Sequence, residues 1–399
     1  MLKKNIHTYS LAFQGIKLLL LAGLLVLPFK WPKATTTLRD AGRASSKKSW
    51  IKLVSEPPKK SSTQNSVVQI KKANELLLST LPDAPPRFSS RGRLISSGYF
   101  SFAPSASLRT EVDFWKIVYT RYDQNSEIIH DSENLGVVYS VLHFEDIERN
   151  SKNSRAQKNL MRQQKIEAEK TRIRTALLKL DAKQSGADAY TAEESELALL
   201  FQDDLNPNKF REAASLDRIR SQTGLKSNFK NAIIRSGAYL PEIEAIFLEY
   251  GLPIELTRMI FVESMFNPQA KSKVGAYGLW QIMPNTAKLY GLNVDENIDE
   301  RADPQRATHV AAQLLAENYR LLQSWPLAIN AYNSGPATLQ SAMRQLGTRD
   351  IATIIQQFRG GVYGFASRNF YPSFLAALEV YNDYPRYFGT LHRDRPLSN

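Results

Sequence analysis

The 399-residue chain contains no cysteine and only five histidines. The absence of cysteine excludes a disulfide framework, a thiol nucleophile, a thiolate metal ligand and an N-terminal cysteine for lipid attachment. The histidines are scattered along the chain, and no two of them are spaced as in an HExxH motif. We therefore expect no dedicated metal site.

Long apolar runs are also absent, which excludes a polytopic membrane protein. The clearest apolar stretch, Leu18–Phe29, follows Lys3 and Lys4 and is shorter than the about 20 residues of a membrane span. A charged head followed by an apolar centre is typical of an export signal. Residues 1–30 are thus predicted to be a signal peptide or an uncleaved signal anchor, and a buried core helix is the less favoured alternative.

Acidic residues are scarce only at the start of the chain. Residues 1–100 hold 17 Lys and Arg against 4 Asp and Glu, which accounts for the whole net charge of +13. The rest of the chain is neutral, so its composition gives no support to nucleic-acid binding. Residues 31–93, rich in Lys, Ser and Pro, are predicted to form a basic disordered tether suited to an anionic membrane surface.

Regular structure is expected from residue 94 onward, with residues 94–235 forming an α+β accessory region. Helical spacing, alternation and turn residues predict the following elements there: a helix at Glu111–Tyr122, two strands at Glu127–Ile129 and Gly136–Phe144, a long charged helix over 145–183, and further helices at Thr191–Phe201, Asp217–Ser221 and Phe229–Ser236. The next helix, Tyr239–Tyr250, belongs to the region that follows. The fold class predicted for the whole chain is mainly α with a small two-stranded β element.

One acidic residue interrupts an apolar helix face farther along the chain. Leu252, Leu256 and Ile260 recur every four residues, and one further step of three reaches Glu263. A carboxyl on a buried face loses hydration, which raises its pKa and allows it to donate a proton near neutral pH. Taken alone, the pattern also fits a glutamate that faces solvent at a frayed helix end.

Three motifs follow in order: Glu263-Ser264, then Gly278-Leu279-Trp280-Gln281-Ile282-Met283-Pro284, then Ala331-Tyr332-Asn333-Ser334-Gly335-Pro336. Together, over about residues 240–385, they resemble the soluble lytic transglycosylase family, whose fold is related to goose lysozyme. The resemblance implies a lysozyme-like helical catalytic domain at residues 236–388, with residues 389–399 as a tail. A weaker similarity to membrane-bound members of the family reaches back to about residue 110.

This resemblance implies a reaction that needs one acid. The family cleaves the β-1,4 bond between N-acetylmuramic acid and N-acetylglucosamine, and Glu263 matches the glutamate that acts first as acid and then as base. The 6-hydroxyl of the sugar attacks C1, which leaves a 1,6-anhydro end without any cofactor. A hydrolase would normally need a second carboxylate about 5 to 9.5 Å away. No Asp or Glu occurs from Ser264 through Pro284, and the acidic segment Asp295–Asp303 is interpreted as a solvated loop and helix cap.

The resemblance also implies a set of substrate-binding residues. Trp280 stands where the family usually has methionine, and Trp280, Tyr290 and Phe266 are aromatics that fit either a sugar platform or the core. The residues that match the family's substrate contacts are Ser272, Gly278, Leu279, Gln281, Tyr332, Asn333 and Tyr371.

Three functions remain open at this point. The first is an exported, monomeric lytic transglycosylase that acts on peptidoglycan glycan strands in the periplasm or cell envelope and is held to the membrane by its N-terminal segment. The second is a hydrolase that uses water, as in goose-type lysozyme. The third is a glycan-binding scaffold with little turnover.

Overall fold

The computed structural model describes residues 102, 104–184 and 189–397. The predicted signal (1–30) and the whole of the predicted tether (31–93) lie outside these residues, and the structure does not test them. Across the described part, no helix combines the length and the apolar content that a membrane span requires.

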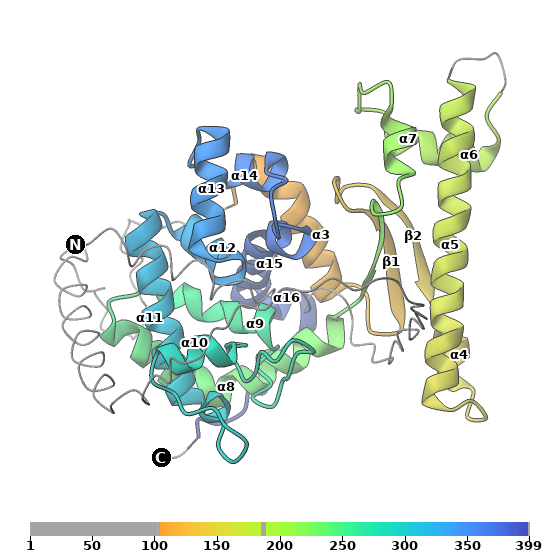
Figure 1. The fold of residues 1–399 in the computed structure, drawn as a ribbon. Coiled ribbons are helices and arrows are strands. Elements are labelled where there is room, and N and C mark those ends of the chain that lie inside the picture. Colours follow the sequence, from red (N-terminus) through yellow and green to blue (C-terminus); the bar gives the residue numbers. More distant parts are fainter. Residues whose placement is uncertain (1–101, 103, 185–188, 398–399) are drawn as a thin grey trace, which may run out of the picture. The chain divides into compact units, whose positions relative to one another are not determined.

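The mainly α fold class is confirmed (Figure 1). The first elements are η1 (Ala106–Leu108), α3 (Arg109–Thr120), β1 (Ser126–Asp131), β2 (Val138–His143), α4 (Glu145–Arg149), α5 (Arg155–Lys183), α6 (Ala192–Leu199), α7 (Lys209–Ala213), β3 (Ile219–Thr223) and α8 (Lys226–Glu249). The later elements are η2 (Ile254–Arg258), α9 (Met259–Glu263), α10 (Pro284–Leu289), η3 (Glu300–Ala302), α11 (Pro304–Leu322), α12 (Trp325–Ser334), α13 (Pro336–Leu346), α14 (Ile351–Gln357), α15 (Phe365–Asn382) and α16 (Tyr384–Phe388).

The small sheet has three antiparallel strands in the order β2-β1-β3, one more than the sequence predicted. The helix predicted at Asp217–Ser221 is wrong, because strand β3 begins at Ile219 and pairs with β1 over its whole length. A five-residue helix gains few internal hydrogen bonds, whereas pairing with β1 satisfies the backbone groups of both strands. Strand β1 is the central strand, and all six of its residues are buried.

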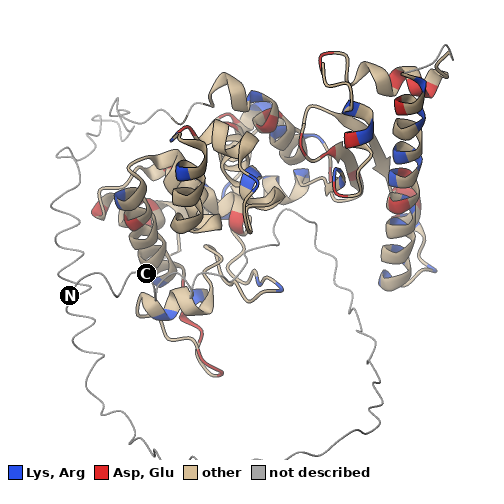
Figure 2. Cartoon of the chain, turned by 45° about the horizontal axis from the view of Figure 1, so that its top comes forward, with Lys and Arg blue, Asp and Glu red and all other residues tan. Residues whose placement is uncertain are grey.

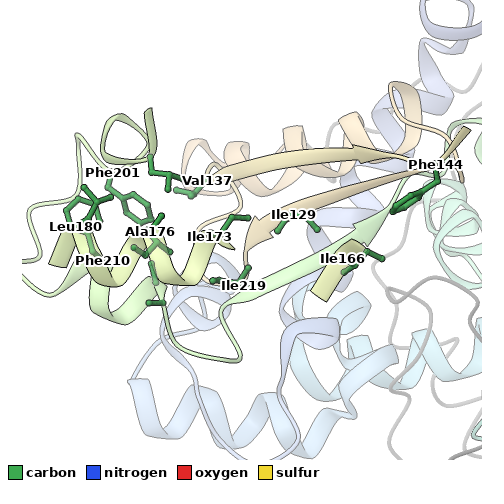
Figure 3. Close-up of a cluster of buried hydrophobic side chains, with 14 of the residues drawn as sticks. Ile129, Val137, Phe144, Ile166, Ile173, Ala176, Leu180, Phe201, Phe210 and Ile219 are labelled. Carbon is green, nitrogen blue, oxygen red and sulfur yellow. The ribbon is translucent and has the colours of Figure 1, made fainter. Parts of the chain in front are cut away.

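Helix α5 packs against this sheet, and α6 and α7 pack on α5. A buried cluster joins β1, α5, α7 and β3 through residues such as Ile129, Ile173, Phe210 and Ile219 (Figure 3). Helix α5 carries many charged residues, more of them basic than acidic (Figure 2). The single helix predicted over 145–183 is in fact two, because Ser154 begins α5 through a capping box with Gln157.

The remaining helices pack around α12, which contacts both α11 and α15. Helix α3 packs on α15 and α8, so the start of the accessory region adjoins the last long helix. Helix α8 is continuous where the sequence predicted two helices, and it runs through the predicted domain boundary at 235/236. Gly237 on α8 lies so near the Asp394 carbonyl that a Cβ there would be 2.4 Å from it, and the Asp394 amide donates to Ile234.

Candidate active site

Glu263 is the last residue of α9 and is buried, with 3% of its surface exposed. Burial of Leu252, Leu256 and Ile260 confirms the predicted apolar face, although its first turn is the 3-10 helix η2 and not α-helix. A solvent-facing glutamate at a frayed helix end is therefore excluded. Glu263 lies inside the protein because it shares the buried helix face of Leu256 and Ile260.

The backbone directly after Glu263 turns sharply. Met265 and Phe266 have φ values of 52° and 55°, a region that residues other than glycine rarely adopt. Arg235 of α8 donates to both carbonyls, at 2.6 Å to Met265 and 3.3 Å to Phe266. The Phe266 ring is buried against Phe261, so it supports the turn from the core side. Strained backbone of this kind persists only where the surroundings fix it, and it is common at functional sites.

Ser264 connects the end of α9 to the glycine-containing loop. Its hydroxyl donates to the Leu279 carbonyl at 2.8 Å. Gly278 has a φ of 79°, and a Cβ at this position would lie 2.1 Å from the Arg301 carbonyl oxygen. Only glycine fits there, which is why the loop can approach the chain of η3 so closely. Leu279 is buried in the core.

Gln281 supports this loop from inside. It is 1% exposed and has a φ of 48°, and its amide nitrogen donates to the carbonyls of Ala270 and Gly278, each at 2.9 Å. Its two amide hydrogens are thus used within the protein. Ser272 is half-buried and accepts a hydrogen bond from the Ala276 amide at 2.8 Å, which closes the turn before Tyr277.

A buried arginine that the sequence analysis missed holds the loop at both ends. Arg301 donates to the carbonyls of Gly275 (2.6 Å) and Ile282 (2.8 Å) and forms an ion pair with Asp299 at 2.7 Å. The hydrogen bond to Arg301 lowers the pKa of Asp299. Asp299 and Asp303 also begin η3 and α11, which confirms the predicted capping role of the acidic segment. The sequence feature that could have drawn attention to Arg301 is its position between two aspartates that cap helices, Asp299 and Asp303.

Tyr332 lies close enough to Glu263 to respond to its charge. Burial first, and then electrostatic interaction with Glu263 and Tyr290, raise the pKa of Tyr332 well above its ordinary value. Its hydroxyl is therefore protonated at neutral pH, and it donates to the Trp280 carbonyl at 2.9 Å. Trp280 itself is core: its indole N–H donates to Thr308 at 2.9 Å and its ring stacks on Phe247.

A second carboxyl, that of Glu317, binds Tyr290, which is an electrostatic neighbour of Tyr332. The Tyr290 hydroxyl donates to Glu317 of α11 at 2.5 Å. Burial and the charge of Glu317 raise the pKa of Tyr290, so this hydroxyl is also protonated. Glu317 lies 54 residues after Glu263 in a helix with ordinary amphipathic spacing, and for that reason the sequence did not single it out.

Asn333 connects the end of α12 to α15, the helix that carries Tyr371. The Asn333 side-chain oxygen accepts a hydrogen bond from Ser367 at 3.0 Å. Tyr371, one turn farther along α15, is buried, and burial raises its pKa. The structure thus places Glu263 within electrostatic range of Tyr332, and it joins Gly278, Leu279 and Gln281 to them through Ser264 and Trp280. The roles of all these residues toward a glycan stay predictions.

No group of three or more His, Asp or Glu side chains within the described residues has the arrangement of a metal site. The candidate site itself contains a buried carboxyl, Glu263, and two tyrosine hydroxyls whose pKa values burial raises, those of Tyr290 and Tyr332.

Residues 247–355 match the family model of the transglycosylase SLT domain. The chain contains a transglycosylase SLT domain. This domain spans Glu263, the loop held by Arg301, and Tyr332, whereas Tyr371 lies outside the matched residues.

The SLT domain has curated relatives. The chain is 30% identical over 176 residues to membrane-bound lytic murein transglycosylase D of Escherichia coli K12, covering 43% of this chain and 38% of that protein. It is 35% identical over 113 residues to peptidoglycan transglycosylase gp16 of Escherichia phage T7, covering 27% of this chain and 9% of that protein. The chain thus spans less than two fifths of the length of either relative.

Among solved structures, the 70 kDa soluble lytic transglycosylase of Escherichia coli is similar at 18% identity and a TM-score of 0.29. That match covers 51% of this chain and 30% of the other.

Proposed function

We propose that the protein is a peptidoglycan lytic transglycosylase in which Glu263 is the single acid and base. It would cleave the β-1,4 bond between N-acetylmuramic acid and N-acetylglucosamine and leave 1,6-anhydro ends. The observation that carries the proposal is the burial of Glu263 beside Tyr332 within a transglycosylase SLT domain.

The environment of Glu263 suits both halves of this reaction. Shielding from water disfavours the ionised form of a carboxyl, so the group holds a proton that it can give to the leaving oxygen. The hydroxyl of Tyr332 remains protonated and is held by the Trp280 carbonyl, so it is a fixed polar group beside the acid. As the leaving oxygen takes the proton held by Glu263, its bond to C1 breaks. The ionised Glu263 can then accept the proton of the sugar 6-hydroxyl, whose oxygen forms the new bond to C1. No water is consumed, and Glu263 ends the reaction with the same number of protons as it began with.

The names of the relatives support an envelope location, because two of them are described as membrane-bound murein transglycosylases. We propose that residues 1–30 export the protein or anchor it and that residues 31–93 tether it near its substrate. Ser272, Gly278, Leu279, Gln281, Tyr332, Asn333 and Tyr371 are proposed to shape the substrate site, with Gln281 acting mainly through the loop that it supports.

Digestion of purified peptidoglycan followed by mass spectrometry tests the reaction. Anhydromuramic ends are expected. Reducing ends would indicate a hydrolase, and a lack of fragments together with retained binding would indicate a scaffold.

Glu263→Gln is nearly isosteric and removes the transferable proton. It is expected to lower the rate of muropeptide release by a factor of at least about 100, the usual scale of general acid–base catalysis, with little change in melting temperature. A variant that still cleaves at the wild-type rate would assign the acid role to another residue.

A further inference from the structure

Two arginines, Arg359 and Arg368, bind one glutamate where the turn between β1 and β2 lies against α15, and a third arginine, Arg220, lies near them. Glu133, in this turn, accepts a hydrogen bond from each terminal nitrogen of Arg368 at 2.6 Å and another from Arg359. Arg220 on β3 lies over the Phe365 ring, with 4.5 Å between its guanidinium carbon and the ring centroid. Burial acts to raise the pKa of Glu133, but the hydrogen bonds and charges of Arg368 and Arg359 lower it. The arginine cluster (Arg220, Arg359 and Arg368) therefore sets three positive charges against one ionised carboxyl.

Two members of the arginine cluster have unused binding capacity. Within residues 102, 104–184 and 189–397, no carboxylate lies at ion-pair distance from Arg220. Burial and the charge of Arg368 lower the pKa of Arg220, and the more distant Asp217 acts in the opposite direction. The buried Nε of Arg368 likewise has no hydrogen-bond acceptor in the described part of the chain. Arginine stays protonated at physiological pH, so this excess positive charge persists.

The arginine cluster is open to solvent on one side. The side chain of Arg359 is 45% exposed and that of Glu133 is 30% exposed, whereas that of Arg368 is 11% exposed. An anion can therefore approach from the Arg359 side and reach guanidinium groups that the protein already holds in place. Guanidinium groups that are fixed before binding lose little freedom on binding, and their planar fork matches a carboxylate.

The arginine cluster also adjoins the candidate active site. Arg368 precedes Tyr371 by three residues on α15, so the two share one face of the helix. The neighbouring Ser367 donates to Asn333, which directly follows Tyr332. The start of α15 therefore links the residue after Tyr332 to the helix that carries Arg368.

We propose that the arginine cluster binds the carboxylates of the peptide stems carried by peptidoglycan glycan strands. This inference rests on the proposed function, since it assumes that a glycan strand occupies the site at Glu263. It gives the accessory region a role in substrate binding, because that region supplies Arg220, one of the three arginines, and Glu133, which holds the other two. In the free protein, Glu133 orders the guanidinium groups while leaving their charge incompletely neutralised.

Binding measured without cleavage separates this inference from the reaction. The Glu263→Gln protein is titrated with soluble, uncross-linked glycan strands that carry peptide stems and, in parallel, with the same strands after amidation of their carboxyls. Arg220→Gln and Arg359→Gln are each expected to raise Kd about tenfold for the acidic strands, which corresponds to about 1.4 kcal/mol, and to leave Kd for the amidated strands unchanged. Arg220→Lys, which keeps the charge, is expected to recover part of the lost affinity.

Glu133→Gln is expected to change Kd in the opposite direction from the arginine variants. It removes the neutralising charge, so Kd for the acidic strands is expected to fall, whereas a purely structural role would make binding weaker in all three variants. Arg386→Gln is the matched control, because Arg386 is an arginine whose side chain is 74% exposed, and it should leave Kd unchanged.

Equal loss of binding to acidic and amidated strands, or no loss in either arginine variant, would overturn the inference. Cleavage by the protein with Glu263 intact is measured separately on the same strands. Charge-dependent binding without cleavage would support the arginine cluster and refute the proposed function, and cleavage without charge-dependent binding would do the reverse.

Discussion

Replacing Gly278 by alanine probes the closest backbone approach beside the candidate active site. A Cβ at Gly278 would lie 2.1 Å from the Arg301 carbonyl oxygen, whereas contacts under 3.0 Å require something to shift. The atom in the way is backbone, and it belongs to the residue whose guanidinium holds Gly275 and Ile282. The loop and η3 must therefore separate by roughly 1 Å if the alanine is to fit.

The chain offers a matched control for this substitution. Gly291 has a φ of 85°, close to the 79° of Gly278, but a Cβ there meets nothing within 4 Å. Alanine at such a φ costs about 1 to 2 kcal/mol at either position. Overpacking adds about 1 to 3 kcal/mol at Gly278 alone, so we expect Gly278→Ala to lower the free energy of unfolding by about 2 kcal/mol more than Gly291→Ala.

Urea denaturation followed by circular dichroism measures both free energies, and muropeptide release measures function. Gly278→Ala should lose most activity, because the shifted loop no longer gives Ser264 its acceptor at Leu279, and Gly291→Ala should keep it. Equal destabilisation of the two variants would show that φ alone matters at Gly278 and would refute the argument from close approach.

Three further substitutions test single interactions. Ser264→Ala leaves the buried Leu279 carbonyl without its donor, so it should lower the free energy of unfolding by about 1 to 3 kcal/mol and also lower kcat. Denaturation and muropeptide release measure the two effects. Unchanged stability would contradict a stabilising role for the hydrogen bond between Ser264 and Leu279. Tyr332→Phe should cost about 1 kcal/mol for the lost bond to Trp280 and lower kcat with little change in KM, and a change in KM alone would instead indicate ground-state binding. His130 is fully buried, and burial lowers its pKa to about 4, assisted by the charges of Arg220 and Lys170 and opposed by its bond to the Asp131 carbonyl. Its folded pKa lies below the unfolded value of about 6.5, so the stability of the neutral form is complete above pH 6.5 and about 3 kcal/mol of it is lost as the pH falls to 4. The difference in unfolding free energy between the wild type and His130→Gln should change by that amount over this window, and a constant difference would exclude a role for this imidazole.

Much of the helical architecture of the accessory region was predictable, because apolar spacing identified helices such as α3 and the long helix that contains α5. The burial of Glu263 followed from its place on the face of Leu256 and Ile260. Strand β3 was not predictable, because its five residues become a strand only through pairing with β1, which lies nearly a hundred residues earlier in the chain.

The supports of the site were less accessible from sequence than the site itself. Arg301 and Arg235 act through backbone carbonyls of segments far from them in sequence, and a backbone acceptor leaves no mark on residue type. For Gln281, residue type was misleading rather than silent. Its residue type suggested a contact with substrate, but its amide hydrogens are used on the carbonyls of Ala270 and Gly278.

The continuity of α8 has a consequence for dividing the protein. A fragment that starts at residue 236 would open in mid-helix and would lack Arg235, whose guanidinium holds the carbonyls of Met265 and Phe266. Removing that charge would free two peptide groups to relax from their left-handed conformations, and the acid preceding them would lose its fixed orientation. Residues from 236 onward therefore cannot be expressed without the first half of α8 and keep this turn. A truncation from the N-terminus that removes Arg235 should abolish turnover, although it leaves Glu263 itself in place.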